Sequence, residues 1–224
     1  MRRFMVAPLA GLLVLGAAAP VLAGPNVGNL SGSATVAQGG WDSYDEATET
    51  YESGYIVVAK DSSSSETYAE YSQYTETQVQ CTGADTPDDP SDDTFASNST
   101  FRYGYGNATL TIGKKGALAT ASGTLSVSEG SFDGCTGEET YAPKDTTGGG
   151  GEAVDVPFTL SLTATSGTIR ETGRGSFKLP GTFNSHSSYK ATYRLAAGTF
   201  DAGNGAQAVT GQFGTVSWTD HSNG

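Results

Sequence analysis

The stretch Val154–Ala164 alternates strictly between apolar and polar positions. Every even-numbered residue is apolar, and every odd-numbered residue is polar or proline. Successive side chains of a strand point to opposite faces, so this pattern predicts a half-buried β-strand. After a Thr-Ser-Gly turn at 165–167 the parity reverses, and the apolar positions of 168–179 are odd-numbered. Two such runs around a Ser-Gly turn predict a β-hairpin.

Strand-like patterns recur along the rest of the chain, with little helical periodicity. The expected strands cover 28–37, 51–60, 66–81, 95–112, 117–127, 187–200 and 206–218. The acidic and aromatic segment 41–49 is expected to form a loop. In the last run the apolar parity switches between Phe213 and Val216, beside Gly211 and Gly214. This switch predicts a β-bulge.

A helix is the alternative around Tyr68, Tyr71 and Tyr74, because these residues are spaced by three. The β-branched residues between 67 and 79 favour a strand instead. Eight or nine strands joined mostly by short turns predict an all-β fold. The sequence leaves open whether this is a single antiparallel β-sandwich or an up-and-down barrel.

The N-terminal segment 1–23 has the features of a cleaved signal peptide. Arg2 and Arg3 precede an apolar run at 5–19, and Val-Leu-Ala at 21–23 offers small residues for cleavage. The run is shorter than the roughly 20 apolar residues that a membrane span needs, and no later stretch approaches that length. We therefore expect a secreted, extracytoplasmic protein without a membrane span.

The remaining residues, 24–224, are enough for one domain with its own core. Four glycines at 148–151 are more consistent with a loop inside this domain than with a linker. The net charge is −12, and it becomes −14 without the two signal-peptide arginines. Residues 24–155 carry 21 acids and 5 bases, whereas residues 156–224 carry 3 acids and 5 bases. This balance disfavours nucleic acid as a partner and leaves cations, glycans or proteins.

The chain contains two cysteines, Cys81 and Cys135. In an exported protein the first expectation for such a pair is a disulfide. In the chain-entropy description, closing this loop stabilises the fold by about 4 kcal/mol.

Both cysteines begin a Cys-Thr-Gly segment that leads into an acidic loop, near 82–94 and near 136–155. A disulfide would bring these loops to the same edge of the fold, where a hard cation such as Ca²⁺ would relieve the repulsion between carboxylates. The candidate metal ligands are Asp85, Asp88, Asp89, Asp92, Asp93, Glu138 and Glu139. The alternative is two solvated acidic loops, because no calcium-loop spacing is present.

A second candidate site is the basic stripe formed by Arg170, Arg174 and Lys178. Their spacing of four residues places them on one strand face, about 13 Å apart. Such a stripe can bind an anionic polymer or an acidic patch of another subunit, or it can be a solvated face that discourages edge pairing. Exposed tyrosines and Trp41 would favour a glycan ligand. Tyr55, Tyr189 and Tyr193 are expected in the core instead, because their same-face neighbours are apolar.

Catalytic motifs are absent from the sequence, and nothing beside its two histidines indicates a Ser-His-Asp triad. We therefore expect a non-enzymatic exported β domain that binds a ligand or serves in the cell envelope. The alternative is a glycan-acting hydrolase with a carboxylate pair, because such a pair is formed in space and cannot be found from composition.

Overall fold

The computed structural model describes residues 28–63, 66–81, 94–142, 153–179 and 183–223. Their fold is all-β and antiparallel, as the sequence predicts. The strands are β1 (Gly28–Asp45), β2 (Thr50–Asp61), β3 (Thr67–Cys81), β4 (Thr94–Ile112), β5 (Leu118–Asp133), β6 (Glu138–Ala142), β7 (Val154–Ala164), β8 (Ile169–Leu179), β9 (Phe183–Asp201) and β10 (Gln207–Asn223). The expected signal peptide at 1–23 and the glycines at 148–151 lie outside the described residues.

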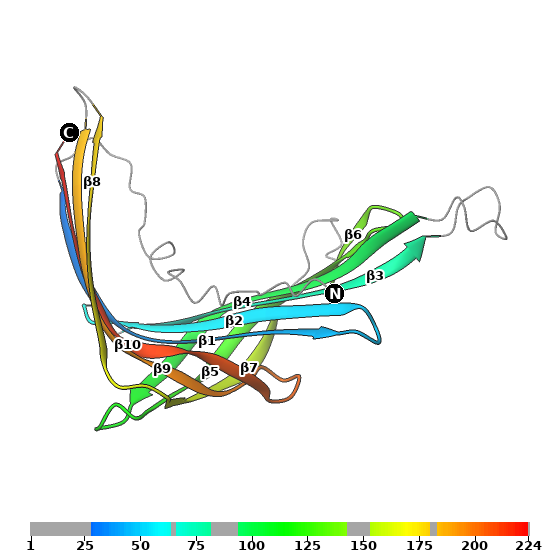
Figure 1. Ribbon diagram of the computed structural model, residues 1–224, viewed down its shortest axis with the longest axis horizontal. Helices are drawn as coiled ribbons and strands as arrows, with labels where there is room; N and C mark the ends of the chain where they lie inside the picture. The colour runs from blue at the N-terminus through cyan, green and yellow to red at the C-terminus, as the bar shows by residue number, and fades with distance from the viewer. Residues whose placement is uncertain (1–27, 64–65, 82–93, 143–152, 180–182, 224) are drawn as a thin grey trace, which may run out of the picture.

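The sheet closes on itself into a barrel. Neighbouring strands pair in the order β1-β2-β3-β4-β5-β7-β9-β10, and β10 pairs again with β1. Every one of these pairings is antiparallel. Of the two architectures that the sequence allows, the protein therefore has the barrel (Figure 1).

The barrel interior is a filled apolar core. Its side chains include Ile56, Leu125, Leu160, Leu162 and Phe213, each at most 2% exposed. The predicted alternation of β7 is confirmed from residue 158 to residue 162, where the even-numbered side chains are buried. Val154, in contrast, is 55% exposed, because β7 begins beyond the packed region.

The predicted hairpin between β7 and β8 is wrong. Both strands pair antiparallel with β9. The strand β7 pairs with the second half of β9 and β8 with the first half, so β7 and β8 follow one another in the same direction. Ala164 pairs with Ala196 and Ile169 with Tyr193, which leaves four residues of the connection opposite two of β9. The break is fixed by two hydrogen bonds: Thr165 N donates to the Leu195 carbonyl (2.8 Å), and Leu195 N donates to Ser166 Oγ (2.9 Å). A parity reversal around a turn fits a hairpin and a broken strand equally well.

Beyond the barrel, four strands continue as a single-layer sheet that we call the arm. It consists of β8 and of the parts of β9, β10 and β1 that pair outside the ring, at 183–193, 217–223 and 28–33. The arm rises at one end of the molecule, and β8 forms its free margin (Figure 1).

The predicted bulge in β10 is also wrong. The pairing of β10 with β9 and with β1 runs without an inserted residue from the barrel into the arm. The parity switches because Phe213 points into the barrel, whereas Trp218 lies on the opposite face of the sheet, against Gly32. The switch therefore marks the junction between barrel and arm.

At the other end, β1 to β6 extend past the ring (Figure 1). The segment predicted as a loop at 41–49 is mostly strand, because β1 reaches Asp45 before turning into β2. Trp41 is fixed there by stacking on Phe200, with ring centroids 5.8 Å apart. The predicted disulfide is confirmed: Cys81 ends β3 and is bonded to Cys135, which follows β5.

Within the described ranges, no helix is long and apolar enough to cross a membrane.

Candidate functional site

The outer surface of β2, β3 and β4 carries a group of aromatic side chains that we call the tyrosine face. The strand registers place them in five consecutive cross-strand rows, each with at least one aromatic ring. Its members are Tyr51, Tyr55, Tyr68, Tyr74, Phe101, Tyr103 and Tyr105. The six tyrosines are between 37% and 62% exposed. Exposed aromatic groups at this density are typical of interaction surfaces.

Carboxylates of β3 hold some of these phenols in place. Tyr55 Oη donates a hydrogen bond to Glu70 Oε1 at 2.7 Å, and Tyr74 Oη donates one to Glu76 Oε2 at 3.1 Å. Burial raises the pKa of Tyr55, and the hydrogen bond to Glu70 raises it further. The phenols of Tyr55 and Tyr74 therefore stay protonated at physiological pH, and each hydrogen bond restrains the orientation of its ring.

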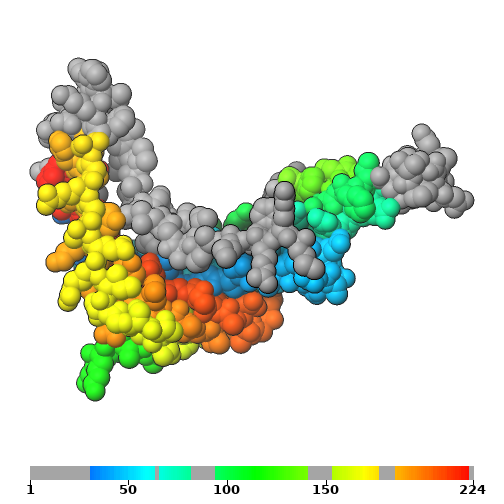
Figure 2. All heavy atoms as spheres, in the orientation of Figure 1, coloured from blue at the N-terminus to red at the C-terminus, as the bar shows by residue number. Residues whose placement is uncertain are grey.

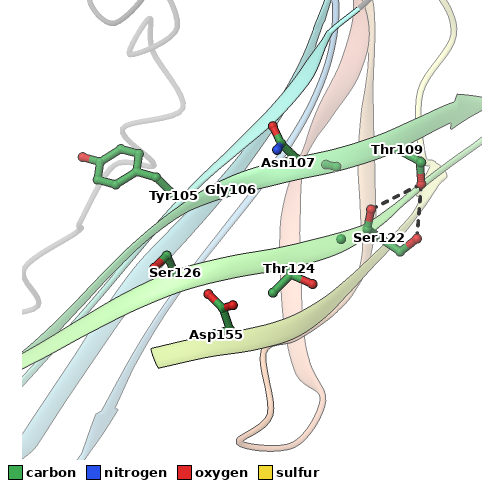
Figure 3. Close-up of a pocket in the computed structure, with 10 residues that line it drawn as sticks. Tyr105, Gly106, Asn107, Thr109, Ser122, Thr124, Ser126 and Asp155 are labelled. Atoms are coloured by element: carbon green, nitrogen blue, oxygen red, sulfur yellow. Dashed lines mark hydrogen bonds between the residues drawn. The ribbon is translucent and has the colours of Figure 1, made fainter. Parts of the chain in front are cut away.

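The tyrosine face continues around the barrel into a shallow hollow on β4, β5 and β7 (Figure 3). Tyr105 stands at its edge, and Asp155 approaches from β7. Its other polar lining groups are Asn107, Thr109, Ser122, Thr124 and Ser126. Hydroxyl, amide and carboxylate groups beside an aromatic ring match a ligand with many hydroxyl groups.

A separate polar network lies on the inner face of the sheet, at the mouth of the barrel. Trp41 Nε1 and Gln73 Nε2 both donate to Glu52 Oε1, at 3.1 and 3.0 Å. Tyr71 Oη donates to Gln73 Oε1 at 2.5 Å. This network closes the apolar core with satisfied polar groups.

Arg102 extends the network across β4 to β5. Its Nε forms an ion pair with Glu129 Oε1 at 2.5 Å, and its Nη1 donates to Tyr71 Oη at 3.5 Å. Burial raises the pKa of Tyr71, and the nearby guanidinium partly opposes that shift. The two carboxylates of the network, Glu52 and Glu129, are both engaged by neighbouring side chains.

The predicted calcium ligands fall mostly outside the described residues. This applies to Asp85, Asp88, Asp89, Asp92 and Asp93. Glu138 and Glu139 are exposed on β6, close to the disulfide. In the part of the chain that is described, no group of three or more His, Cys, Asp or Glu side chains is arranged to hold a metal ion. The calcium site stays a prediction.

The predicted basic stripe lies on β8 in the arm. Arg170 and Arg174 are exposed, and they lie opposite Thr192 and Ser188 of the neighbouring strand β9. Lys178 occupies the next same-face position, opposite Asn184. The three positions are therefore on one face, as expected.

The core environment expected for three tyrosines is wrong. Tyr55 is 38% exposed, and Tyr189 and Tyr193 are partly exposed on the arm, outside the core. The continuous apolar run at 55–59 hides which parity faces inward, since Ile56 and Val58 are the fully buried residues. The alternation in β3 was the available signal, because Tyr71 points inward and Tyr68 and Tyr74 point outward.

No family model, curated protein or solved structure matches this chain.

Proposed function

We propose that this protein is an exported, non-enzymatic binding protein that holds a neutral polysaccharide on its tyrosine face. The observation that carries the proposal is the set of seven aromatic side chains on the outer surface of three adjacent strands. Sugar rings present apolar C–H faces that pack on aromatic rings, and their hydroxyl groups need hydrogen-bonding partners at the rim.

The charges around the face favour a neutral ligand over an anionic one. Glu70 and Glu76 lie between the tyrosines, and Asp155 lines the adjoining hollow. An anionic polymer would meet these carboxylates and be repelled. The extended shape of the face, five rows along the strands, suits a linear chain of several sugar units.

A hydrolase is not proposed as a second function. The carboxylates that the fold brings into one network, Glu52 and Glu129, take part in the hydrogen bonds and ion pair that close the barrel mouth.

The test is affinity electrophoresis of the full chain in gels that contain a neutral β-linked glucan. The variant Tyr103→Ala/Tyr105→Ala removes two exposed rings that neighbour each other on β4. We expect its affinity to fall by about tenfold or more, as for the loss of central aromatic contacts in interfaces. Leu195→Ala is the control, because Leu195 is 43% exposed and belongs to β9.

Equal retardation of the wild type and the double variant would overturn the proposal. A parallel gel with a polymer of amino sugars separates ring stacking from charge attraction. If only the cationic polymer binds, and the double variant binds it equally, the carboxylates and not the rings hold the ligand.

A further inference from the structure

The arm has a basic face that is wider than the stripe on β8. Directly opposite residues of paired strands point to the same side of a sheet. His186 on β9 is opposite His221 on β10, and Lys190 is opposite Thr172 on β8, so these groups share the face of Arg170 and Arg174. We define the basic face by Arg170, Arg174, His186, Lys190 and His221, all of which are exposed.

This face carries no acidic residue at any described position. The other same-face positions of β8 and of the arm parts of β9, β10 and β1 are Ser, Thr, Asn or Lys. The acidic residues of the arm, Glu171 and Asp220, lie on the opposite face, where Glu171 accepts a hydrogen bond from Tyr193 and Asp220 accepts one from Ser185. A protein with a net charge of −12 thus presents one surface on which the charged side chains at described positions, among them Arg170, Arg174 and Lys190, are all positive.

The opposite end of the molecule is acidic. The β1–β2 hairpin carries Asp42, Asp45, Glu46 and Glu49, all exposed, and no Lys or Arg occurs at positions 24–59. Glu138 and Glu139 on β6 are exposed at the same end. These six residues form the acidic end.

The β1–β2 hairpin is ordered by its own turn. Asp45 Oδ1 accepts a hydrogen bond from Ala47 N at 2.9 Å. Hydrogen bonding to this backbone group lowers the pKa of Asp45, which keeps the carboxylate ionised. Glu49 closes the turn in the left-handed region, with φ of 51°. The acidic groups are therefore presented on a defined structure.

We propose that the basic face of one copy of this chain binds the acidic end of a second copy. The two surfaces have opposite charge and lie at opposite ends of the molecule (Figure 1), so one copy cannot satisfy both by itself. In Figure 2, β8 (yellow) lies along the left margin, far from the β1–β2 hairpin. The contact joins two different surfaces, so association continues from copy to copy, as in heterologous assemblies.

The second copy is favoured over an anionic glycan because its complementary surface is part of the same chain. The inference does not depend on glycan binding, since the basic face lies on the arm, whereas the tyrosine face lies on β2, β3 and β4. An assembly would also present several tyrosine faces together, which raises the apparent affinity for a polymer.

Salt should affect this association in two opposing ways. At about 0.01 M ionic strength the Debye length is about 30 Å, and the net negative charges of two copies repel each other. At about 0.1 M the length is about 10 Å, which screens that repulsion but spares contacting charges. We expect association to be strongest at about 0.1 M ionic strength and to disappear at about 1 M, where the Debye length is about 3 Å.

The test is sedimentation velocity of the full chain over a range of concentrations near 0.1 M ionic strength. The variant Arg170→Glu/Arg174→Glu should weaken self-association by about tenfold or more. Lys114→Glu/Lys115→Glu is the matched control, because it changes the net charge equally in the exposed β4–β5 turn. We expect the control to stay within about threefold of the wild type.

A mixing experiment then identifies the two surfaces. The variant Glu138→Lys/Glu139→Lys/Glu46→Lys should also self-associate about tenfold more weakly, or more weakly still, when alone, because three of the six acidic residues become basic. Mixed with Arg170→Glu/Arg174→Glu, it should form one-to-one complexes, since one intact surface of each kind remains.

Three results would overturn the proposal: a monomeric wild type at every salt concentration, equal loss in the lysine control, or no complex in the mixture. Thermal unfolding of each variant verifies that a lost contact is not a lost fold. A monomeric wild type that binds a carboxylated polysaccharide through Arg170 and Arg174 would assign the face to a glycan instead.

Discussion

The barrel and the arm are built from the same strands but are stabilised in different ways. In the barrel, the curvature of the sheet encloses one face of each strand, and Phe213 on β10 is 2% exposed. In the arm, the same strand continues in register, yet Trp218 is only partly buried and covers Gly32 within a single layer. Alternation of polar and apolar residues therefore predicts a strand in both regions, but it predicts a core only where the sheet closes.

The largest expected difference is between two aromatic residues of β10. Phe213→Ala should cost about 3–5 kcal/mol of unfolding free energy, because it leaves a cavity in a packed interior. Trp218→Ala should cost about 1–2 kcal/mol, because part of the indole is already in water. Urea unfolding measures both. Equal costs would show that the arm has a core of its own.

Removal of the disulfide should have the next largest effect. Cys81→Ser/Cys135→Ser releases a loop with a sequence separation of 54 residues, which should cost about 2–4 kcal/mol. Because the bond joins the end of β3 to the β5–β6 turn, far from the arm, the loss should be seen in the unfolding of the barrel. An unchanged urea midpoint in the double variant would contradict this expectation.

Substitution of two glycines compares how the barrel and the arm tolerate one added methyl group. A Cβ at Gly198 would collide with the backbone carbonyl of Ser161 in the barrel, whereas at Gly173 it would meet the ring of Tyr189 in the arm. Gly198→Ala should cost about 1–3 kcal/mol, because neighbouring backbones must move apart. Gly173→Ala should cost less than about 1 kcal/mol, because a partly exposed ring can turn aside. The reverse order would mean that the arm is the more rigid region.

The smallest expected effect is a loss of unfolding free energy at alkaline pH, above the physiological pH range. Burial raises the pKa of Tyr68 and Tyr71 in the folded barrel above the value of about 10 in the unfolded chain. The stability that this contributes is fully present below pH about 10 and is lost as the pH rises through the folded value. Urea unfolding at a series of pH values should show a decline that starts near pH 10. Tyr71→Phe should make the decline shallower, whereas Tyr44→Phe serves as an exposed control.

The sequence predicts what is local in this fold and misses what depends on distant strands. The strand β7 and the inward direction of Phe158 follow from alternation alone, and the disulfide follows from the presence of two cysteines in a chain whose N-terminal sequence predicts export. The direction of β8 does not follow, because it depends on whether β8 pairs with β7 or with β9.

The candidate surfaces show the same limit. The stripe of Arg170 and Arg174 is visible in the sequence, because spacing within one strand fixes the face. The position of His186 opposite His221 is not visible, since it depends on the register between β9 and β10. The tyrosine face is missed for the same reason, as its rows combine residues of three strands.

The pairing of Ala164 with Ala196 has a consequence for how such a chain can change in length. If residues 166–193 were replaced by a short turn, β7 would lead directly into β9, and the ring of eight strands would remain a simple meander. The other parts of the arm are the start of β1 and the end of β10, which are free to shorten. The arm can therefore be added to the barrel or removed from it by lengthening or trimming strands, without altering the order in which they are connected.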